Sequence, residues 1–269
     1  MPEAPLILIT NDDGIASPGL KAAVRAVLGL GTLLVVAPAT QQTAMGRSFT
    51  GRRDAGLEPV DYQVDGQALR AFACEGSPAC VVAHALRVLC LERRPDLVIS
   101  GINYGENMGS SISASGTIGA ALEAATWGLK ALATSQQMHP SSFLHHGEQD
   151  WTAAEHFLRQ FAGRMLAATL PFDLDVLKVD VPEGATAATP WRLGRLSRQR
   201  YIETVLDHPT LDSRLGDGRV TIQVDPATLE PGSDIHTLVH LRQVAVTPLS
   251  LDATSRTDFA TLQALLTAP

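Results

Sequence analysis

Two adjacent carboxylates near the start of the chain are the residues best suited to chemistry. Asp12 and Asp13 follow the apolar run 6–9, which reads as a buried strand, and they precede Gly14. Two neighbouring carboxylates repel each other, and the pKa of one of them rises, unless a cation lies between them. A hard divalent cation prefers carboxylate and amide oxygens, so the pair indicates a metal site. A solvated acidic turn is the alternative, but the position directly after a buried strand favours the metal.

Further ligands are predicted in two other loops. The apolar runs 33–37 and 96–100 also read as buried strands, and the polar loops after them contain Thr43 and Asn103. Open parallel sheets bind ligands at the carboxyl ends of their strands, so these loops and the Asp-Asp pair can converge. Asn103 offers an amide oxygen as a neutral ligand. An asparagine beside glycine is, on its own, more often a turn former, and its place after a third strand is what favours ligation.

A phosphate-binding element is predicted at the start of a helix of small residues. Ser115, Gly116 and Thr117 open this helix, and the free N–H groups and dipole of a helix N-terminus bind anions. Ordinary N-capping by Ser115 explains the same residues equally well. Ser48 lies in the long polar loop 39–56, where a donor could reach a phosphate, the alternative being a solvated flexible loop.

Other catalytic signatures are absent from the sequence. The chain has no H-E-x-x-H or C-x-x-C pattern for zinc, no G-x-x-x-x-G-K-[ST] or G-x-G-x-x-G pattern for nucleotide phosphates, and no G-x-S-x-G esterase elbow. The 3 cysteines are odd in number and favour reduced thiols. His139, His145 and His146 belong to a polar connector and are expected at the surface.

The elements that must position these residues follow an α/β order. Strands are predicted at 6–9, 33–37, 96–100, 132–135, 174–181 and 235–246, a hairpin at 62–72, and helices at 17–28, 77–91, 115–127, 151–166 and 255–266. Apolar strands that alternate with helices indicate a doubly wound, mostly parallel sheet. Beyond Pro182 this rhythm gives way to short irregular runs. We therefore expect a core at 1–182 and a C-terminal part at 183–269.

Charge and hydropathy exclude several partners. The net charge is −7, with 21 Lys and Arg against 28 Asp and Glu, which argues against a nucleic-acid duplex because phosphate backbones need a basic surface. The first apolar run is short and has no basic residues before it, so it is a strand and no signal peptide. No apolar stretch is long enough to cross a bilayer. A cytoplasmic protein without membrane contact is expected.

Taken together, these residues resemble the SurE family of nucleotidases. The most specific runs are I-T-N-D-D-G-I at 9–15, D-L-V-I-S-G-I-N-Y-G at 96–105 and S-G-T-I-G-A-A at 115–121; the runs at 35–38, 48–50, 76–81 and 246–249 also match. The family fold is a Rossmann-like α/β domain with a C-terminal β-hairpin and helix arm that swaps between subunits. The resemblance therefore implies a homodimer or homotetramer.

The resemblance also implies a site. Asp12, Asp13 and Asn103 fall on metal-ligand positions of the family, and Thr43 stands where the family has a serine ligand. It implies one divalent ion per subunit, Mn²⁺ or Mg²⁺ before Ca²⁺. For substrate and phosphate binding the matching residues are Asn11, Ser48, Gly101, Ser115, Gly116 and Thr117. Two departures stand out, because the family's acidic-basic pair after Pro38 and its N-x-N pattern near Lys178 are missing.

The activity implied is that of a 5′/3′-nucleotidase, a phosphomonoesterase that hydrolyses nucleoside monophosphates by attack of a metal-activated water. Asp12 or Asp13 would orient or deprotonate that water. Two rival enzymes are a phosphatase with an aspartyl-phosphate intermediate, which typically needs a D-x-D strand end, and a polyphosphate-cleaving phosphatase. A third rival is a nucleotide- or metal-binding regulator without turnover. The sequence leaves base preference, 5′ or 3′ selectivity and the physiological metal open.

Overall fold

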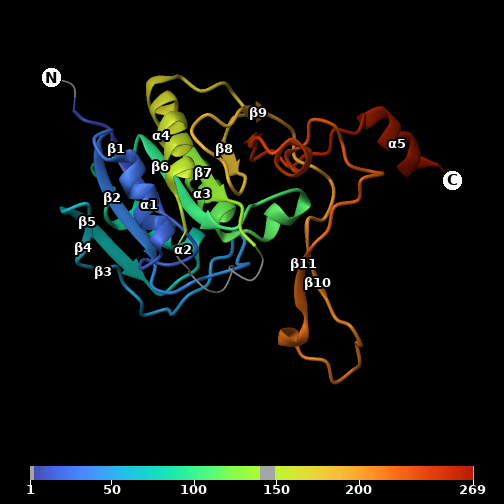
Figure 1. Ribbon diagram of the computed structural model, residues 1–269, viewed down its shortest axis with the longest axis horizontal. Helices are drawn as coiled ribbons and strands as arrows, with labels where there is room; N and C mark the ends of the chain where they lie inside the picture. Colours follow the sequence, from blue (N-terminus) through green and yellow to red (C-terminus); the bar gives the residue numbers. More distant parts are fainter. Residues whose placement is uncertain (1–2, 140–148, 269) are drawn as a thin grey trace.

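The architecture is a ten-stranded sheet with helices on both faces, in a computed structural model that describes residues 3–139 and 149–268 (Figure 1). Six strands are parallel, in the spatial order β5 (Gln67–Cys74), β2 (Thr32–Pro38), β1 (Leu6–Thr10), β6 (Leu97–Tyr104), β7 (Ala131–Gln136) and β8 (Val176–Val181). On one side β3 (Glu58–Pro59) and β4 (Tyr62–Val64) pair antiparallel with β5. On the other, β12 (Val244–Leu249) runs antiparallel to β8, and β9 (Trp191–Leu193) runs parallel to β12.

The central strands form because their apolar runs are buried on both faces. All eight residues of β6 are buried, as expected for a parallel sheet that is covered on both sides. The helices α1 (Pro18–Val27) and α4 (Thr152–Ala167) pack on one face, and α2 (Pro78–Val88) and α3 (Gly116–Thr126) pack on the other. The doubly wound α/β fold predicted from the sequence is confirmed.

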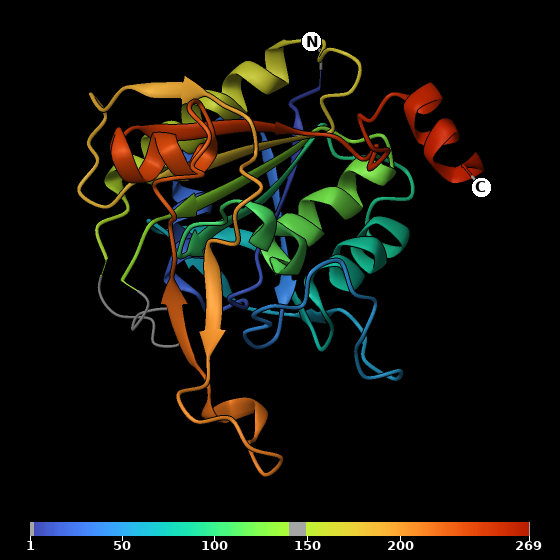
Figure 2. The ribbon, with the colours of Figure 1, turned by 90° about the vertical axis from the view of Figure 1, so that its right-hand side faces the viewer.

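The later part of the chain combines sheet strands with a projecting hairpin. Strands β10 (Ile202–Val205) and β11 (Arg219–Ile222) pair antiparallel, and η3 (Leu215–Asp217) lies in the connection between them. Figure 2 shows this hairpin extending away from the sheet, and the terminal helix α5 (Phe259–Thr267) standing apart from the body. Strands β9 and β12 lie beyond residue 182 but belong to the main sheet. The division of the chain at residue 182 into a core and a C-terminal part stays a prediction.

One predicted strand is wrong. The stretch 235–246 contains a helical turn, η4 (His236–His240), and strand β12 begins only at Val244. The side chain of Asp234 accepts the backbone N–H of Ile235 (2.9 Å), and the hydroxyl of Ser233 accepts that of His236 (3.2 Å). These two side chains satisfy the amides that open the turn, as N-caps do, so the local apolar pattern does not continue as a strand.

A buried ion cluster joins the sheet to the C-terminal part. The Lys178 ammonium on β8 pairs with Asp180 and lies 3.2 Å from the Asp234 carboxylate, and all three side chains are fully buried. Lys178 also donates to the backbone oxygen of Asn107 (2.7 Å), while Asp180 accepts the N–H of Asn107 (2.8 Å). The family's N-x-N pattern is thus replaced here by a Lys and an Asp that hold the loop after β6.

Remaining expectations concern the histidines, the cysteines and the membrane. His139 is exposed, whereas His145 and His146 lie outside the described residues. The cysteines Cys74, Cys80 and Cys90 are free thiols, and burial raises the pKa of each. In the described part of the chain, no helix has the length and apolar character that crossing a membrane requires.

Candidate active site

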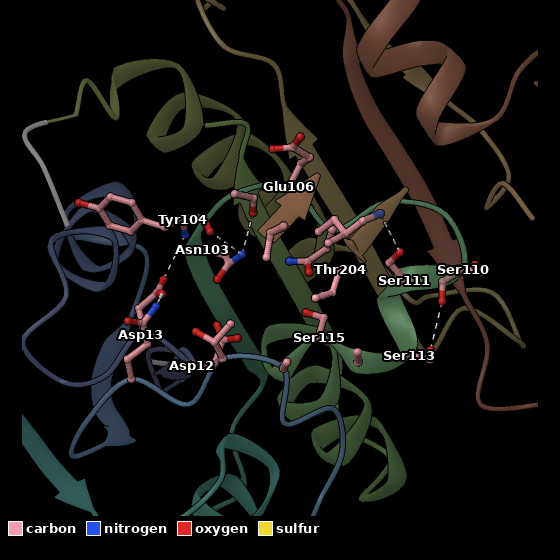
Figure 3. Close-up of a pocket in the computed structure, with 18 of the residues that line it drawn as sticks. Asp12, Asp13, Asn103, Tyr104, Glu106, Ser110, Ser111, Ser113, Ser115 and Thr204 are labelled. Atoms are coloured by element: carbon pink, nitrogen blue, oxygen red, sulfur yellow. Dashed lines mark hydrogen bonds between the residues drawn. The ribbon is translucent and has the colours of Figure 1, made fainter. Parts of the chain in front are cut away.

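A cavity of about 700 Å³ opens at the carboxyl ends of β1 and β6 (Figure 3). Its walls come from four segments of the chain: the loop after β1, the loop after β2, the end of β6 with the turn that follows, and the β10–β11 hairpin. The lining residues are Asp12, Asp13, Gln41, Thr43, Ala44, Asn103, Tyr104, Gly105, Glu106, Asn107, Ser110, Ser111, Ser113, Ala114, Ser115, Arg200, Ile202, Thr204 and Val220. The four predicted metal ligands are therefore brought together.

The loop after β1 is shaped by Asn11 and Gly14. The Asn11 amide donates to the Gly14 carbonyl, and its oxygen accepts the Gly14 N–H, both at 3.2 Å. Gly14 has φ +94°, and a Cβ there would lie 3.1 Å from the carbonyl carbon of Thr40. Only glycine adopts this conformation readily. Asn11 is fully buried and is absent from the cavity wall, so it holds the loop that presents the two carboxylates.

Asp12 is seated on the N-terminus of α3. The Thr117 hydroxyl donates to its Oδ1 at 2.5 Å. Burial, and then the charge of Asp13, raise the pKa of Asp12 to about 7, against the lowering effect of the hydrogen bonds from Thr117. A carboxyl that keeps its proton well above the usual pH range in the absence of a cation is the consequence expected for two neighbouring carboxylates.

Asp13 and Asn103 are fixed by the end of β6. The Tyr104 N–H donates to Asp13 Oδ2 (3.1 Å), and the Gln41 amide donates to Asp13 Oδ1 (3.2 Å). The Asn103 amide nitrogen donates to the carbonyls of Tyr104 (3.2 Å) and Gly105 (2.7 Å). This leaves the Asn103 amide oxygen directed toward the Asp12 carboxylate, as Figure 3 shows.

The donor set suits a hard divalent cation. Asp12, Asp13, Asn103 and Thr43 all line the cavity, and carboxylate, amide and hydroxyl oxygens are ligands that Mg²⁺, Mn²⁺ and Ca²⁺ prefer. Within residues 3–139 and 149–268, no group of three or more His, Cys, Asp or Glu side chains is placed to hold a metal. The typical nitrogen and sulfur ligands of zinc are thus not assembled in this part of the chain.

Of the six residues predicted for substrate binding, Ser115 lines the cavity, while the other five are not among its lining residues. The oxygen of Ser115 accepts the N–H of Ile118 (3.2 Å) and caps α3. The O–H of Ser115 stays available as a donor, because a hydroxyl donates one hydrogen bond and accepts two. The predicted cradle therefore contributes one side chain to the cavity and uses its other two residues, Gly116 and Thr117, to seat Asp12.

Gly101 and Ser48 instead make contacts that hold the backbone in place. Gly101 has φ +132°, and a Cβ there would lie 2.2 Å from the carbonyl oxygen of Thr134 on β7, so it permits the irregular pairing between β6 and β7. The backbone oxygen of Ser48 accepts the Ser77 hydroxyl (2.5 Å). Next to it, Arg47 pairs with Glu123 on α3 at 3.0 Å. Gly101, Ser48, Ser77, Arg47 and Glu123 are all absent from the lining of the cavity.

Two parts of the cavity were not predicted from the sequence, the buried Glu106 and the β10–β11 hairpin. Glu106 is buried, and its carboxylate accepts the Tyr201 hydroxyl (2.5 Å) and the Met138 N–H (3.3 Å). Burial raises the pKa of Glu106, although the hydrogen bond from Tyr201 opposes the shift. The glycine- and serine-rich stretch that contains Glu106 after β6 could have indicated this part of the cavity, but no local motif marks the hairpin.

Comparisons with known proteins identify relatives of this chain. The family model for survival protein SurE matches residues 7–203. The 5′-nucleotidase SurE of Methanocella arvoryzae is 42% identical over 256 residues, which cover 93% of this chain and 93% of that protein. The 5′-nucleotidase SurE of Thermococcus gammatolerans is 40% identical, with 97% of this chain and 95% of that protein covered.

The fold is also found in a solved relative. The crystal structure of the SurE protein from Aquifex aeolicus superposes with a TM-score of 0.72 at 27% identity, covering 97% of this chain and 100% of that one. The family model extends from β1 to β10 and includes the carboxylate pair, Asn103 and the start of α3. The sequence match, the fold and the convergence of these residues lead to one conclusion: the chain belongs to the SurE family.

Proposed function

We propose that this chain is a divalent-metal-dependent phosphomonoesterase that hydrolyses nucleoside monophosphates. The observation that carries the proposal is the meeting of Asp12, Asp13 and the Asn103 amide oxygen at one end of a 700 Å³ cavity. Cavities of roughly 300–1,000 Å³ are typical of small-molecule sites, and a phosphate group alone needs far less space. The names of the curated relatives, 5′-nucleotidase SurE, support this substrate class.

The charges of the cavity wall support the metal. Asp12, Asp13 and Glu106 are the acidic residues that line the cavity, and Arg200 is the one basic residue among the lining residues. A phosphate dianion placed beside two carboxylates is repelled unless a cation lies between them. Asp12, Asp13, Asn103 and Thr43 would hold one such ion, with Mn²⁺ or Mg²⁺ as the first choices.

The protein groups have separable roles in the reaction. A bound divalent cation supplies Lewis acidity toward a phosphoryl oxygen and acidifies water. Asp12 and Asp13 hold the cation, and one of the two accepts the proton of the attacking water. The Ser115 O–H donates to a phosphoryl oxygen, where negative charge is redistributed during hydrolysis. The Tyr104 N–H and the Gln41 amide keep Asp13 in place throughout.

Phosphate release tests the function. The panel comprises nucleoside 5′- and 3′-monophosphates and tripolyphosphate, first with a chelator and then with Mn²⁺, Mg²⁺ or Ca²⁺ added in excess. We expect turnover of nucleoside monophosphates only after metal addition, and its loss in Asp13→Asn. The matched control is Asp61→Asn, which changes an exposed carboxylate outside the cavity. Nucleotide binding without phosphate release under every condition would contradict the proposal and favour a regulator.

The assembly proposed from the family resemblance is a homodimer or homotetramer joined by the C-terminal arm. Helix α5 has no buried residue and exposes Phe259, Leu265 and Leu266. The hairpin connection exposes Leu211 and Leu215 completely. Large apolar side chains exposed on these two segments support protein contacts there. Light scattering coupled to size exclusion tests this assembly, and a monomer at micromolar concentration would contradict it. The cytoplasmic location stays a prediction.

A further inference from the structure

The β10–β11 hairpin presents one defined face to the cavity. Side chains alternate between the two faces of a strand, and Arg200, Ile202 and Thr204 accordingly share the face that lines the cavity. Val220 of β11 pairs with Thr204 across the hairpin and lines it too. Tyr201, between Arg200 and Ile202 in sequence, is buried and absent from the cavity lining, and its hydroxyl donates to Glu106.

The root of the hairpin is held against the serine-rich turn η1 (Ser110–Ala114). The backbones of Arg200 and Gly109 form an isolated antiparallel β-bridge, and the Ser110 N–H donates to the Gln199 carbonyl at 2.9 Å. The Ile202 N–H donates to the Ser111 hydroxyl at 3.2 Å. These contacts fix the hairpin face relative to the rest of the cavity. Figure 3 shows Thr204 and Ser111 on the side of the cavity away from Asp13.

The two ends of the cavity differ in chemistry. One end carries the carboxylates and the amide oxygen, which suit a cation and a phosphate. The hairpin end carries two apolar side chains, Ile202 and Val220, with the hydroxyl of Thr204 and the guanidinium of Arg200 beside them. Apolar and guanidinium groups pack on the flat faces of aromatic rings, so this end suits a planar heterocycle with an attached sugar.

We propose that the hairpin face binds the nucleoside part of the substrate, with Ile202 and Val220 as specificity-determining residues that contact the base. This inference rests on the proposed function of the same cavity. Arg200 and Thr204 are the hydrogen-bonding side chains of this face, whereas Ile202 and Val220 contact the base without bonding to its polar edge. Apolar contact with the face of a ring is tolerant of base identity because every base has a π-face. The enzyme therefore discriminates weakly between bases but strongly between a nucleotide and a bare sugar phosphate.

The test is the ratio of kcat/KM for adenosine monophosphate to kcat/KM for ribose 5-phosphate, measured with saturating Mn²⁺. Loss of an apolar contact lowers such a ratio by about 10–200-fold. For Ile202→Ser and Val220→Ser we expect a fall of about tenfold or more, mainly through KM for the nucleotide. Val205→Ser, an apolar change on the same hairpin but outside the cavity, should leave the ratio at its wild-type value.

Failure of this inference can be told from failure of the proposed function. If both substrates lose activity equally in Ile202→Ser, or if the ratio does not change, the hairpin does not read the nucleoside and the inference is overturned. If the wild type hydrolyses neither compound, the proposed function fails. Calorimetric titration of the same two compounds into wild type and Ile202→Ser then decides the inference alone, because tighter binding of the nucleotide must depend on Ile202.

Discussion

Gly116 leaves the space that Asp12 occupies. A Cβ at position 116 would lie 2.8 Å from both Cβ and Oδ2 of Asp12, closer than real Cβ contacts. The neighbouring Thr117 hydroxyl donates to the other carboxylate oxygen at 2.5 Å. The start of α3 therefore positions a predicted metal ligand, and it does so through both a missing side chain and a hydrogen bond.

Gly116→Ala should weaken metal binding. The added methyl group displaces the Asp12 carboxylate, and changes to groups that orient metal ligands typically cost about 10–100-fold in affinity. Calorimetric titration with Mn²⁺ measures the effect. Gly163→Ala is the matched control, since an added Cβ at this position in α4 meets nothing within 4 Å. Equal Mn²⁺ affinity in the two variants would contradict the seating of Asp12 by Gly116.

The affinity for metal should depend on pH through Asp12. A cation binds the ionised carboxylate, and the pKa of Asp12 in the metal-free protein is raised to about 7 by burial and by Asp13. Below that pH the cation must displace a proton, so the apparent affinity should rise by up to about tenfold per pH unit and level off above pH 7. Titrations with Mn²⁺ from pH 5.5 to 8 measure this. An affinity that does not change across this range would exclude a raised pKa at Asp12.

Asp12→Asn should stabilise the metal-free protein while it abolishes turnover. The folded-state pKa of Asp12 is raised above its unfolded value of 3.8, so the folded protein binds more protons and loses stability as the pH rises from about 4 to 7. Asparagine removes this loss, and we expect a gain of about 1–3 kcal/mol in the free energy of unfolding at pH 8. The gain should shrink toward pH 4. Urea denaturation in chelator at both pH values measures it, and a loss of stability at pH 8 would contradict the prediction.

Lys178→Met should be strongly destabilising. Burial alone would lower the pKa of Lys178, but Asp180 and Asp234 outweigh it and raise that pKa, so the ammonium stays charged. Its removal leaves two buried carboxylates without their cation, and breaking a buried pair costs about 3–5 kcal/mol. Urea denaturation measures the loss, with exposed Lys21→Met as the control expected within about 0.5 kcal/mol of wild type.

A compensating change distinguishes charge from packing at this cluster. Asp180→Asn in the Lys178→Met background removes one of the uncompensated carboxylates and should recover part of the lost stability. If the double variant is less stable than the wild type by the sum of the losses measured for Lys178→Met and Asp180→Asn separately, the cluster does not act as a unit. The prediction would then be wrong.

The sheet and the metal end of the cavity could be predicted from local patterns. Each parallel strand is an apolar run of strand length bounded by polar residues, and the topology of such a sheet gathers the loops at its carboxyl edge. Asp12 and Asp13 follow β1, Thr43 lies in the loop after β2, and Asn103 lies near the end of β6. The order of strands and loops alone therefore predicts that these residues approach one another. The helix predicted at 17–28 is confirmed as α1 for the same reason, because its pattern is local.

The remaining wall of the cavity depends on contacts between distant segments. Ile202 meets Ser111 across 91 positions of the chain, and Tyr201 meets Glu106 across 95. No local sequence pattern in the hairpin or in the turn after β6 predicts that the two segments meet. The role of Gly116 and Thr117 was also hidden, because a helix start that binds phosphate and one that binds a carboxylate of the same chain have the same sequence.

The central claim is that Asp12, Asp13 and Asn103 hold one divalent cation that phosphomonoester hydrolysis requires. It is tested most directly by titrating metal-free protein with Mn²⁺ while bound Mn²⁺, by electron paramagnetic resonance, and phosphate release from adenosine monophosphate are measured on the same sample. We predict one Mn²⁺ per chain, turnover that follows its occupancy, and the loss of both in Asp13→Asn. Turnover in chelator, or full Mn²⁺ binding by Asp13→Asn, would contradict the claim.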